Sequence, residues 1–176
     1  LPYEEMESSL ARSYTDIVVF DNDMKPVIEQ VKAAGTTNVT TWINMDEDGQ
    51  HLSISELIAE GKAAMEDGCD EYFRLPIDNK AIDILLFTSG TTSMAKAVML
   101  SQYNITSNLY SLQRAEDIRH GDVNMAFLPY HHTFGSIGQI VMLSRGVTTA
   151  FCDGLRYLQN NLVEYKVSVF FCVPLL

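Results

Sequence analysis

The sequence predicts an α/β fold with a mostly parallel, doubly wound sheet and flanking helices. The first indication is that short apolar, β-branched segments alternate with segments whose apolar residues recur at helical spacing. The second is the helix boundary signals between them, such as Gly35 after one predicted helix and Ser53 before another. The third is that 176 residues with 47% hydrophobic side chains can form a domain with a sizeable core.

The first half of the chain alternates predicted helices and strands. Residues 3–12 have helical spacing because Met6 and Leu10 fall near one face, and Ser53 with Glu56 makes a predicted capping box. The predicted elements are a helix at 3–12, a strand at 17–20, a helix at 26–34, a strand at 38–44 and a helix from 53 through 65. This order favours parallel strands joined by crossover helices.

The second half continues the alternation. The predicted elements are strands at 82–87 and 97–100, a helix at 104–116, a strand at 123–127, a helix at 136–143, and strands at 147–151 and 167–173. We therefore expect two parts. Residues 1–78 form a β-α-β subdomain, and residues 79–176 hold a polar loop and the strands that follow it.

The overall charge narrows the choice of partner. The formal net charge is −11, so the surface as a whole repels nucleic acid backbones and anionic membranes. No apolar run reaches the roughly 18 to 20 residues that a membrane span needs. We therefore expect neither a nucleic acid partner nor a transmembrane segment.

The cysteines and the chain ends carry two further expectations. Cys69, Cys152 and Cys172 are an odd number without metal-ligand spacing, and we expect them to be small buried hydrophobes in a reducing, cytoplasmic compartment. The chain opens without an initiator methionine or a targeting segment and closes on the apolar run VSVFFCVPLL. We expect it to be a segment of a longer polypeptide.

A cluster of small, mostly hydroxylated residues follows the apolar strand predicted at 82–87. The cluster consists of Thr88, Ser89, Gly90, Thr91, Thr92 and Ser93, with Lys96 just downstream. Hydroxyls and the backbone N–H groups of a turn can converge on phosphate oxygens, while a lysine supplies a mobile positive charge. We interpret the segment as a polyphosphate-binding loop, and a plain polar turn is the alternative. It is not a G-x-x-x-x-G-K-[ST] loop, because Ala97 follows the lysine.

Two motifs resemble one enzyme family. The segment TSGTTSMAKAV at residues 88–98 resembles the TSGTTG-x-PKG-V hallmark of adenylate-forming enzymes, which include fatty acyl-CoA synthetases, luciferases and peptide-synthetase adenylation domains. The segment LPYHHTFG at 128–135 is similar to their LP-x-x-H-x-x-G motif, and residues 1–10 and 170–176 are also similar. The resemblance thus covers nearly the whole chain, as a middle slice of the family's large N-terminal domain. The departures are Ser93 and Ala97 in place of glycines and Ala95 in place of proline.

The resemblance implies roles for individual residues. Thr88, Ser89, Gly90, Thr91, Thr92 and Ser93 would surround the ATP β- and γ-phosphates. Lys96 would steady the departing pyrophosphate, and Thr88 would lie near Mg²⁺. His132 matches the motif histidine at the acyl-adenylate pocket, near the entrance for the carboxylate or thiol. We expect the His131 side chain to point away from that of His132, as neighbours on an extended strand do, and to be structural. We also expect His51 and His120, which lie in polar loops, to be structural.

The implied activity is that of an acyl-CoA synthetase. A carboxylate attacks the α-phosphorus of ATP to give an acyl-adenylate and pyrophosphate, and coenzyme A then displaces AMP to give a thioester. The implied partners are these small molecules and the remainder of the polypeptide, including a mobile C-terminal domain that carries a catalytic lysine. The family's YG-x-TE segment is absent from these 176 residues, so we expect the isolated chain to be inactive.

Three interpretations of the function stay open. The sequence HHTFG at 131–135 favours a fatty or other acyl substrate over an amino acid. Another adenylate-forming enzyme, such as an aryl-CoA ligase or a peptide-synthetase adenylation domain, is the second interpretation. The third is a non-catalytic α/β module in which the polar loop is merely a turn.

Overall fold

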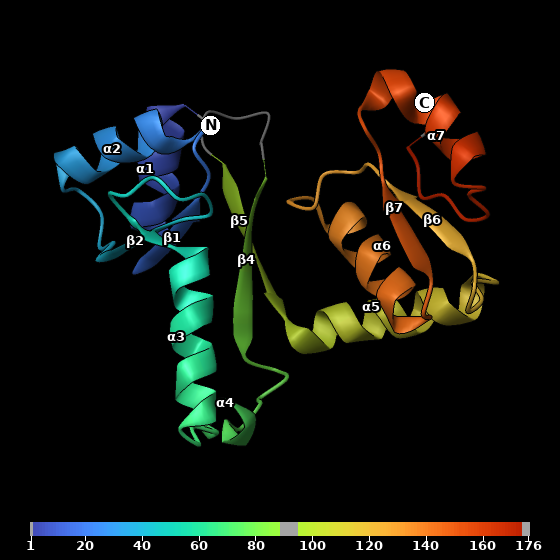
Figure 1. The fold of residues 1–176 in the computed structure, drawn as a ribbon, viewed down its shortest axis with the longest axis horizontal. Helices are drawn as coiled ribbons and strands as arrows, with labels where there is room; N and C mark the ends of the chain where they lie inside the picture. Colours follow the sequence, from blue (N-terminus) through green and yellow to red (C-terminus); the bar gives the residue numbers. More distant parts are fainter. Residues whose placement is uncertain (1, 89–94, 174–176) are drawn as a thin grey trace. The chain divides into compact units, whose positions relative to one another are not determined.

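The computed structural model describes residues 2–88 and 95–173, which divide into two compact units (Figure 1). The first unit comprises Leu1–Asp78 and Phe87–Ala97, and the second comprises Asn79–Leu86 and Val98–Leu176. Each unit contains parallel strands and flanking helices, so the predicted α/β class is confirmed. Within the described residues, no helix combines the length and the apolar character that crossing a bilayer requires.

The first unit is built on a three-stranded parallel sheet in the order β1-β2-β3. Its strands are β1 (Ile17–Phe20), β2 (Thr41–Asn44) and β3 (Leu52–Ser53), and its helices are α1 (Tyr3–Arg12), α2 (Lys25–Ala34), α3 (Ile54–Glu66) and α4 (Glu71–Arg74). The crossover from β1 to β2 runs through α2, as the alternation of the sequence predicts. Gly35 ends α2 with a φ of 63°, a left-handed conformation that favours glycine.

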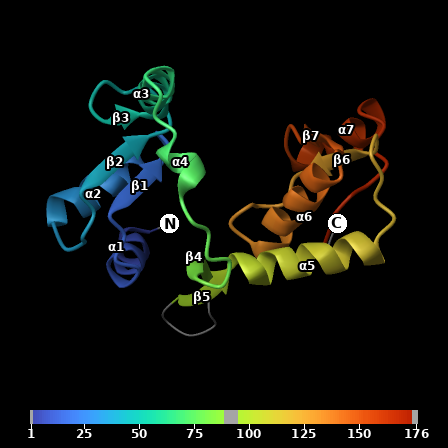
Figure 2. The same cartoon turned by 90° about the horizontal axis from the view of Figure 1, so that it is seen from below.

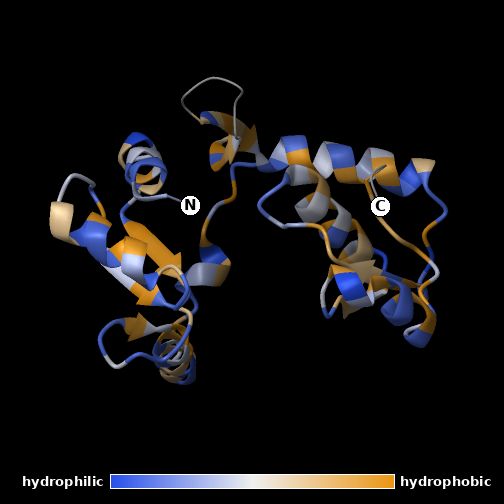
Figure 3. Ribbon diagram, turned by 90° about the horizontal axis from the view of Figure 1, so that it is seen from above, coloured by the Kyte–Doolittle hydropathy of each residue, from blue (hydrophilic) through white to orange (hydrophobic). Residues whose placement is uncertain are grey.

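The core of the first unit lies on one face of this sheet. Val18 and Phe20 alternate with exposed neighbours along β1 and pack against Ile28 of α2, while Leu10 of α1 packs against the same cluster. Period-two alternation along the strand therefore meets one apolar stripe from each helix. In the hydropathy view the strands show orange segments beside paler and blue ones, and the helices also mix polar and apolar residues (Figure 3).

Strands β4 (Ile82–Thr88) and β5 (Lys96–Ser101) form a separate two-stranded sheet. Residues 89–95 connect them, and a parallel crossover needs a dozen or so residues, so the pair is a hairpin with antiparallel strands. Residues Phe87–Ala97 belong to the first unit and the rest of the hairpin belongs to the second.

The second unit has its own parallel pair, β6 (Val123–Ala126) and β7 (Thr148–Phe151). Its helices are α5 (Gln102–Ala115), α6 (Thr133–Ser144) and α7 (Leu158–Glu164), and a 3₁₀ turn, η1 (Leu155–Tyr157), precedes α7. Val141 and Met142 of α6 are fully buried and pack with Val147 and with Leu109 and Leu112 of α5. Figures 1 and 2 show α5 beside α6 and β6 beside β7.

Some element boundaries differ from the prediction. The strand expected at 38–44 covers only Thr41–Asn44, and the strand expected at 167–173 is wrong. Val169 makes a single parallel bridge to Asn124, while the N–H of Val123 donates to the Ser168 hydroxyl at 3.0 Å. A side-chain acceptor thus replaces a ladder partner at this point, which interrupts regular pairing. The structure also contains η1 and α7 in a part of the chain for which the sequence predicts no element.

The cysteines correct a second expectation. Cys69 and Cys172 are exposed and Cys152 is half-buried, and none forms a disulfide. An apolar run buries a residue only where another element packs over it. Cys172 lies beyond the bridge at Val169, outside any ladder among the described residues.

Candidate functional site

Thr88 and Lys96 lie across from each other where the β4-β5 pair ends. Thr88 is the last residue of β4 and Lys96 the first of β5, and both are exposed. The Thr88 hydroxyl donates a hydrogen bond of 3.4 Å to the backbone carbonyl of Lys96. No carboxylate among the described residues forms an ion pair with Lys96. The predicted residues Ser89, Gly90, Thr91, Thr92 and Ser93 lie outside the described residues.

A residue that the sequence analysis did not single out touches both strands at this end. Arg12, in the last turn of α1, donates a hydrogen bond from Nη1 to the carbonyl of Ala95 at 2.7 Å. The central carbon of its guanidinium lies 5.7 Å from the ring centre of Phe87. The sequence shows only that Arg12 is a basic residue in the last turn of a predicted helix, where its charge interacts favourably with the helix dipole. The long-range contact could not be read from that pattern.

His132 stands at the start of α6 in the second unit. It is the N-cap residue, it is exposed, and its N–H donates to the carbonyl of Pro129 at 3.2 Å. The expectation that His131 points the opposite way is wrong, because residues 130–132 form a turn and not a strand. The two imidazole rings lie 4.2 Å apart between centres. A helix N-terminus favours anions, so this position suits an anionic group.

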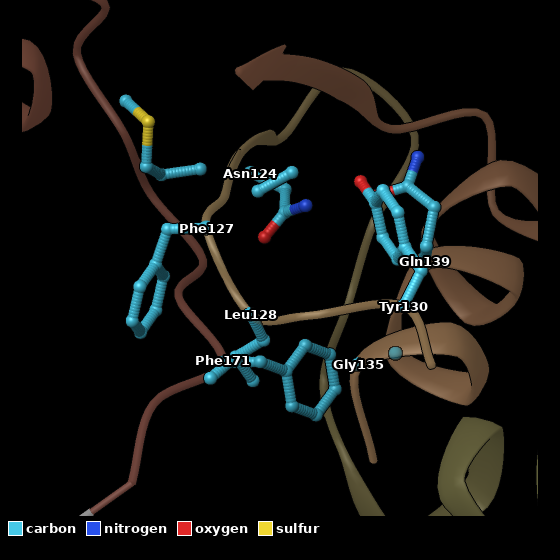
Figure 4. A pocket seen from close by; sticks show the side chains of 10 residues that line it. Asn124, Phe127, Leu128, Tyr130, Gly135, Gln139 and Phe171 are labelled. Carbon is cyan, nitrogen blue, oxygen red and sulfur yellow. The ribbon is translucent and has the colours of Figure 1, made fainter. Parts of the chain in front are cut away.

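A pocket opens between the carboxyl end of β6 and the start of α6 (Figure 4). It is a small, partly open hollow of about 20 Å³, room for about one water molecule, and its lining includes Asn124, Tyr130, Gly135, Gln139 and Phe171. An added Cβ at Gly135 would lie 2.4 Å from the carbonyl oxygen of Pro129, so this position accepts only glycine without a backbone shift. Ligands of open α/β sheets bind at such carboxyl edges.

Two polar side chains give this pocket its character. Asn124 is 4% exposed, and its Oδ1 atom accepts no hydrogen bond from the described residues. Partial burial raises the pKa of the Tyr130 phenol, a group that is already neutral and able to donate a hydrogen bond at ordinary pH. The pocket is therefore mainly apolar with a few groups that can accept or donate a hydrogen bond.

A second polar cluster lies on the loop between β2 and β3. Asp48 accepts hydrogen bonds from the Asn44 amide at 3.0 Å and from His51 Nδ1 at 2.9 Å, and it pairs with Lys25 Nζ at 2.8 Å. His51 Nε2 faces Glu29 Oε1 at 2.8 Å. The Lys25 ammonium, followed by backbone and His51 hydrogen bonds, holds the pKa of Asp48 well below its usual range. The carboxylate of this cluster is therefore fully paired, whereas His51 Nε2 is buried and, although it lies close to Glu29, makes no hydrogen bond among the described residues.

The remaining candidates add no metal centre. The His120 ring packs against Gly146, where an added Cβ would lie 2.6 Å from its Cδ2 atom. The described part of the chain contains no group of three or more His, Cys, Asp or Glu residues that could hold a metal ion. Thr88 offers one hard oxygen ligand, and Mg²⁺ is often held by one or two protein ligands together with substrate phosphates.

The whole chain, residues 1–176, matches the family described as AMP-binding enzyme, and the protein belongs to that family. It is 29% identical to probable 4-coumarate–CoA ligase 3 of Dictyostelium discoideum, over 87% of this chain and 29% of that protein. It is 30% identical to long-chain-fatty-acid–CoA ligase 5 of Mus musculus, over 93% of this chain and 26% of that protein.

The solved structures agree on the fold. The crystal structure of ATP-bound MatB from Rhodopseudomonas palustris superimposes with a TM-score of 0.72 at 23% identity, over 97% of this chain and 32% of that one. The chain thus spans between about a quarter and a third of the proteins it matches.

Proposed function

We propose that the protein is an AMP-forming acid–CoA ligase that activates a fatty acid with ATP and transfers the acyl group to coenzyme A. The observation that carries the proposal is the placement of an exposed hydroxyl and an exposed ammonium, on Thr88 and Lys96, at adjacent strand ends. Membership of the AMP-binding family and the likeness to a long-chain-fatty-acid–CoA ligase support it.

In this proposal, Thr88 and Lys96 act on the phosphates of ATP. The Lys96 ammonium stabilises the charge that develops on the pyrophosphate as it leaves, and the Thr88 hydroxyl donates to a phosphate oxygen. The ATP bound in one structural neighbour supports this choice of nucleotide. Mg²⁺ bound together with the nucleotide would supply further charge neutralisation, and the Thr88 hydroxyl oxygen would be a protein ligand for it.

His132 takes the other half of the proposed chemistry. The exposed imidazole at the N-terminus of α6 suits the carboxylate of the acid substrate, because both the helix end and the imidazole can offer N–H donors. The neighbouring hollow is lined mainly by apolar groups but, at about 20 Å³, has room for only about one water-sized group, so most of the hydrocarbon part of that substrate would lie outside it. Coenzyme A is the proposed acceptor because both curated relatives are named CoA ligases.

An aromatic acid is the second candidate substrate. The likeness to a probable 4-coumarate–CoA ligase favours it, and the Tyr130 and Phe171 rings in the pocket lining are suited to stacking. The Tyr130 phenol and the Oδ1 atom of Asn124, which has no hydrogen-bond partner among the described residues, are also suited to hydrogen-bonding a hydroxylated ring.

We further propose that the 176 residues alone do not complete the reaction. They span only about a quarter to a third of their relatives, so a further domain of the same polypeptide is the proposed partner. We propose the cytoplasm as the location, because free, exposed thiols such as Cys69 persist in reducing compartments.

The test is carboxylate-dependent exchange of labelled pyrophosphate into ATP. We expect the complete protein to catalyse exchange with a long-chain fatty acid, faster than with 4-coumarate, and the 176-residue chain to give none. Faster exchange with 4-coumarate would assign the aromatic substrate. No exchange with any carboxylate by the complete protein would refute the ligase proposal.

A further inference from the structure

We propose that Arg12 is a positioning residue that fixes the two strand ends carrying Thr88 and Lys96 in the geometry that receives the nucleotide phosphates. The inference rests on the proposed function for the identity of the ligand, but its structural part concerns only described residues. Arg12 itself is not proposed to touch the substrate.

The contacts of Arg12 reach both strands of the hairpin. The hydrogen bond from Nη1 goes to Ala95, the residue directly before Lys96, and the ring that the guanidinium faces belongs to Phe87, the residue directly before Thr88. Each contact is therefore one residue from a proposed phosphate-binding group. A single side chain that contacts both strands restrains their separation and register at this end.

The helix that carries Arg12 is itself well anchored. Leu10, two residues earlier, packs against the buried cluster of Val18, Phe20 and Ile28, and α1 packs beside α2. The Ser13 hydroxyl then donates to the carbonyl of Ser9 at 2.8 Å, which closes the end of the helix. The guanidinium thus connects a helix that packs on the core of the first unit with the ends of β4 and β5.

The chemistry of arginine fits this task. A guanidinium can donate to a carbonyl and face an aromatic ring at the same time, since it is planar and has five N–H donors. A lysine ammonium reproduces the charge and one donor but not the planar stacking. We therefore expect Arg12→Lys to restore part of what Arg12→Ala removes.

Direct evidence can come from amide hydrogen exchange in the full chain without nucleotide. We expect Arg12→Ala to speed amide exchange about tenfold in the peptide that begins at Ala95 and covers β5, with Arg12→Lys between this variant and the wild type. Lys32→Ala is the matched control, because Lys32 is also a basic residue in the last turn of a helix of the same unit. It should leave this peptide unchanged.

The outcomes are distinguishable. If the peptide exchanges at the wild-type rate in Arg12→Ala while α1 keeps its protection, Arg12 does not fix the strand ends and the inference is refuted. If Arg12→Ala also loosens α1, the Arg12→Lys variant separates the two effects. We expect this variant to protect α1 fully and the peptide only in part. Wild-type protection of the peptide in Arg12→Lys would refute the arginine-specific role.

The catalytic part is read in the complete protein. We expect Arg12→Ala to raise the KM for ATP several-fold and also to lower kcat, because the Lys96 ammonium, which is proposed to contact bound ATP and the departing pyrophosphate, is misplaced but not removed. If the KM for ATP is unchanged although amide hydrogen exchange of the peptide is faster, Arg12 has only a structural role and the positioning claim is refuted. Absence of any ATP turnover in the wild type would refute the proposed function, but it would not affect the amide hydrogen exchange result for Arg12.

Discussion

Two polar regions of the first unit differ in whether their polar groups are paired. The Asp48 carboxylate accepts from the Asn44 amide, the His51 ring and the Lys25 ammonium, and the Asp48 side chain is only 7% exposed. Around Thr88 and Lys96, one long hydrogen bond of 3.4 Å connects two exposed residues. Groups that satisfy one another stabilise a fold, whereas unsatisfied exposed groups are available to a ligand. Whether the polar groups of a loop are paired therefore indicates a ligand site better than the residue composition of the loop does.

The first prediction gives the largest expected effect. Lys96→Ala should lower the kcat/KM of carboxylate-dependent pyrophosphate exchange by about 10²-fold, as removal of a transition-state charge stabiliser does. The midpoint of thermal unfolding should barely change, because Lys96 is exposed and unpaired among the described residues. Lys32→Ala is the control for loss of a surface charge. Wild-type pyrophosphate exchange in Lys96→Ala would mean that the unpaired region around Thr88 and Lys96 does not bind the ligand.

The second prediction reverses the first. Asp48→Asn should clearly lower the midpoint of thermal unfolding, because the substituted amide cannot accept all the bonds that Lys25, Asn44 and His51 now make. Steady-state exchange below the unfolding temperature should stay at the wild-type level. A variant of equal stability but reduced exchange would mean that the Asp48 region serves the ligand and not the fold.

The third prediction concerns pH. The pKa of Asp48 is lowered in the folded state, first by Lys25, so the unfolded chain binds more protons at this group. Its stabilising contribution is therefore full above its unfolded pKa of about 3.9 and decreases as the pH falls below about 4. The wild type should lose more stability than Asp48→Asn between pH 5 and pH 3 in urea titrations. Asp23→Asn, which changes an exposed carboxylate, should keep the wild-type slope.

The fourth prediction compares two hydroxyls with the smallest expected effects. Ser53 caps α3 and exchanges hydrogen bonds with Glu56, so Ser53→Ala should reduce the free energy of unfolding by about 1 kcal/mol. Thr88→Val should change it by less than about 0.5 kcal/mol, since the exposed hydroxyl makes one weak bond. Equal losses in chemical denaturation would mean that Thr88 is structural.

Local signals predicted much of this structure. The cap at Ser53 and Glu56, the end of α2 at Gly35 and the strand at 17–20 are all determined by residues close in sequence. The failures depend on distant partners. Val169 makes one bridge instead of a strand because Ser168 pairs with Val123, and Cys172 is exposed because no described strand covers it.

The candidate site shows the same division. The polar cluster and Lys96 could be found from their order in the chain, and the structure brings Thr88 and Lys96 together because the strands pair. The contact from Arg12 to Ala95 spans 83 residues, and no local pattern reports it. The sequence predicts extended backbone at His131 and His132, whereas a turn brings the two rings together, and two adjacent histidines carry no local signal that separates these conformations.

The most direct test of the central claim compares the binding of ATP and AMP to Lys96→Ala by calorimetric titration. If Lys96 binds the outer phosphates, its removal should weaken ATP binding at least about tenfold, as loss of a charge-assisted contact does, while AMP affinity stays unchanged. Equal weakening for both nucleotides, or no weakening for either, would contradict the assignment of these strand ends to the phosphates.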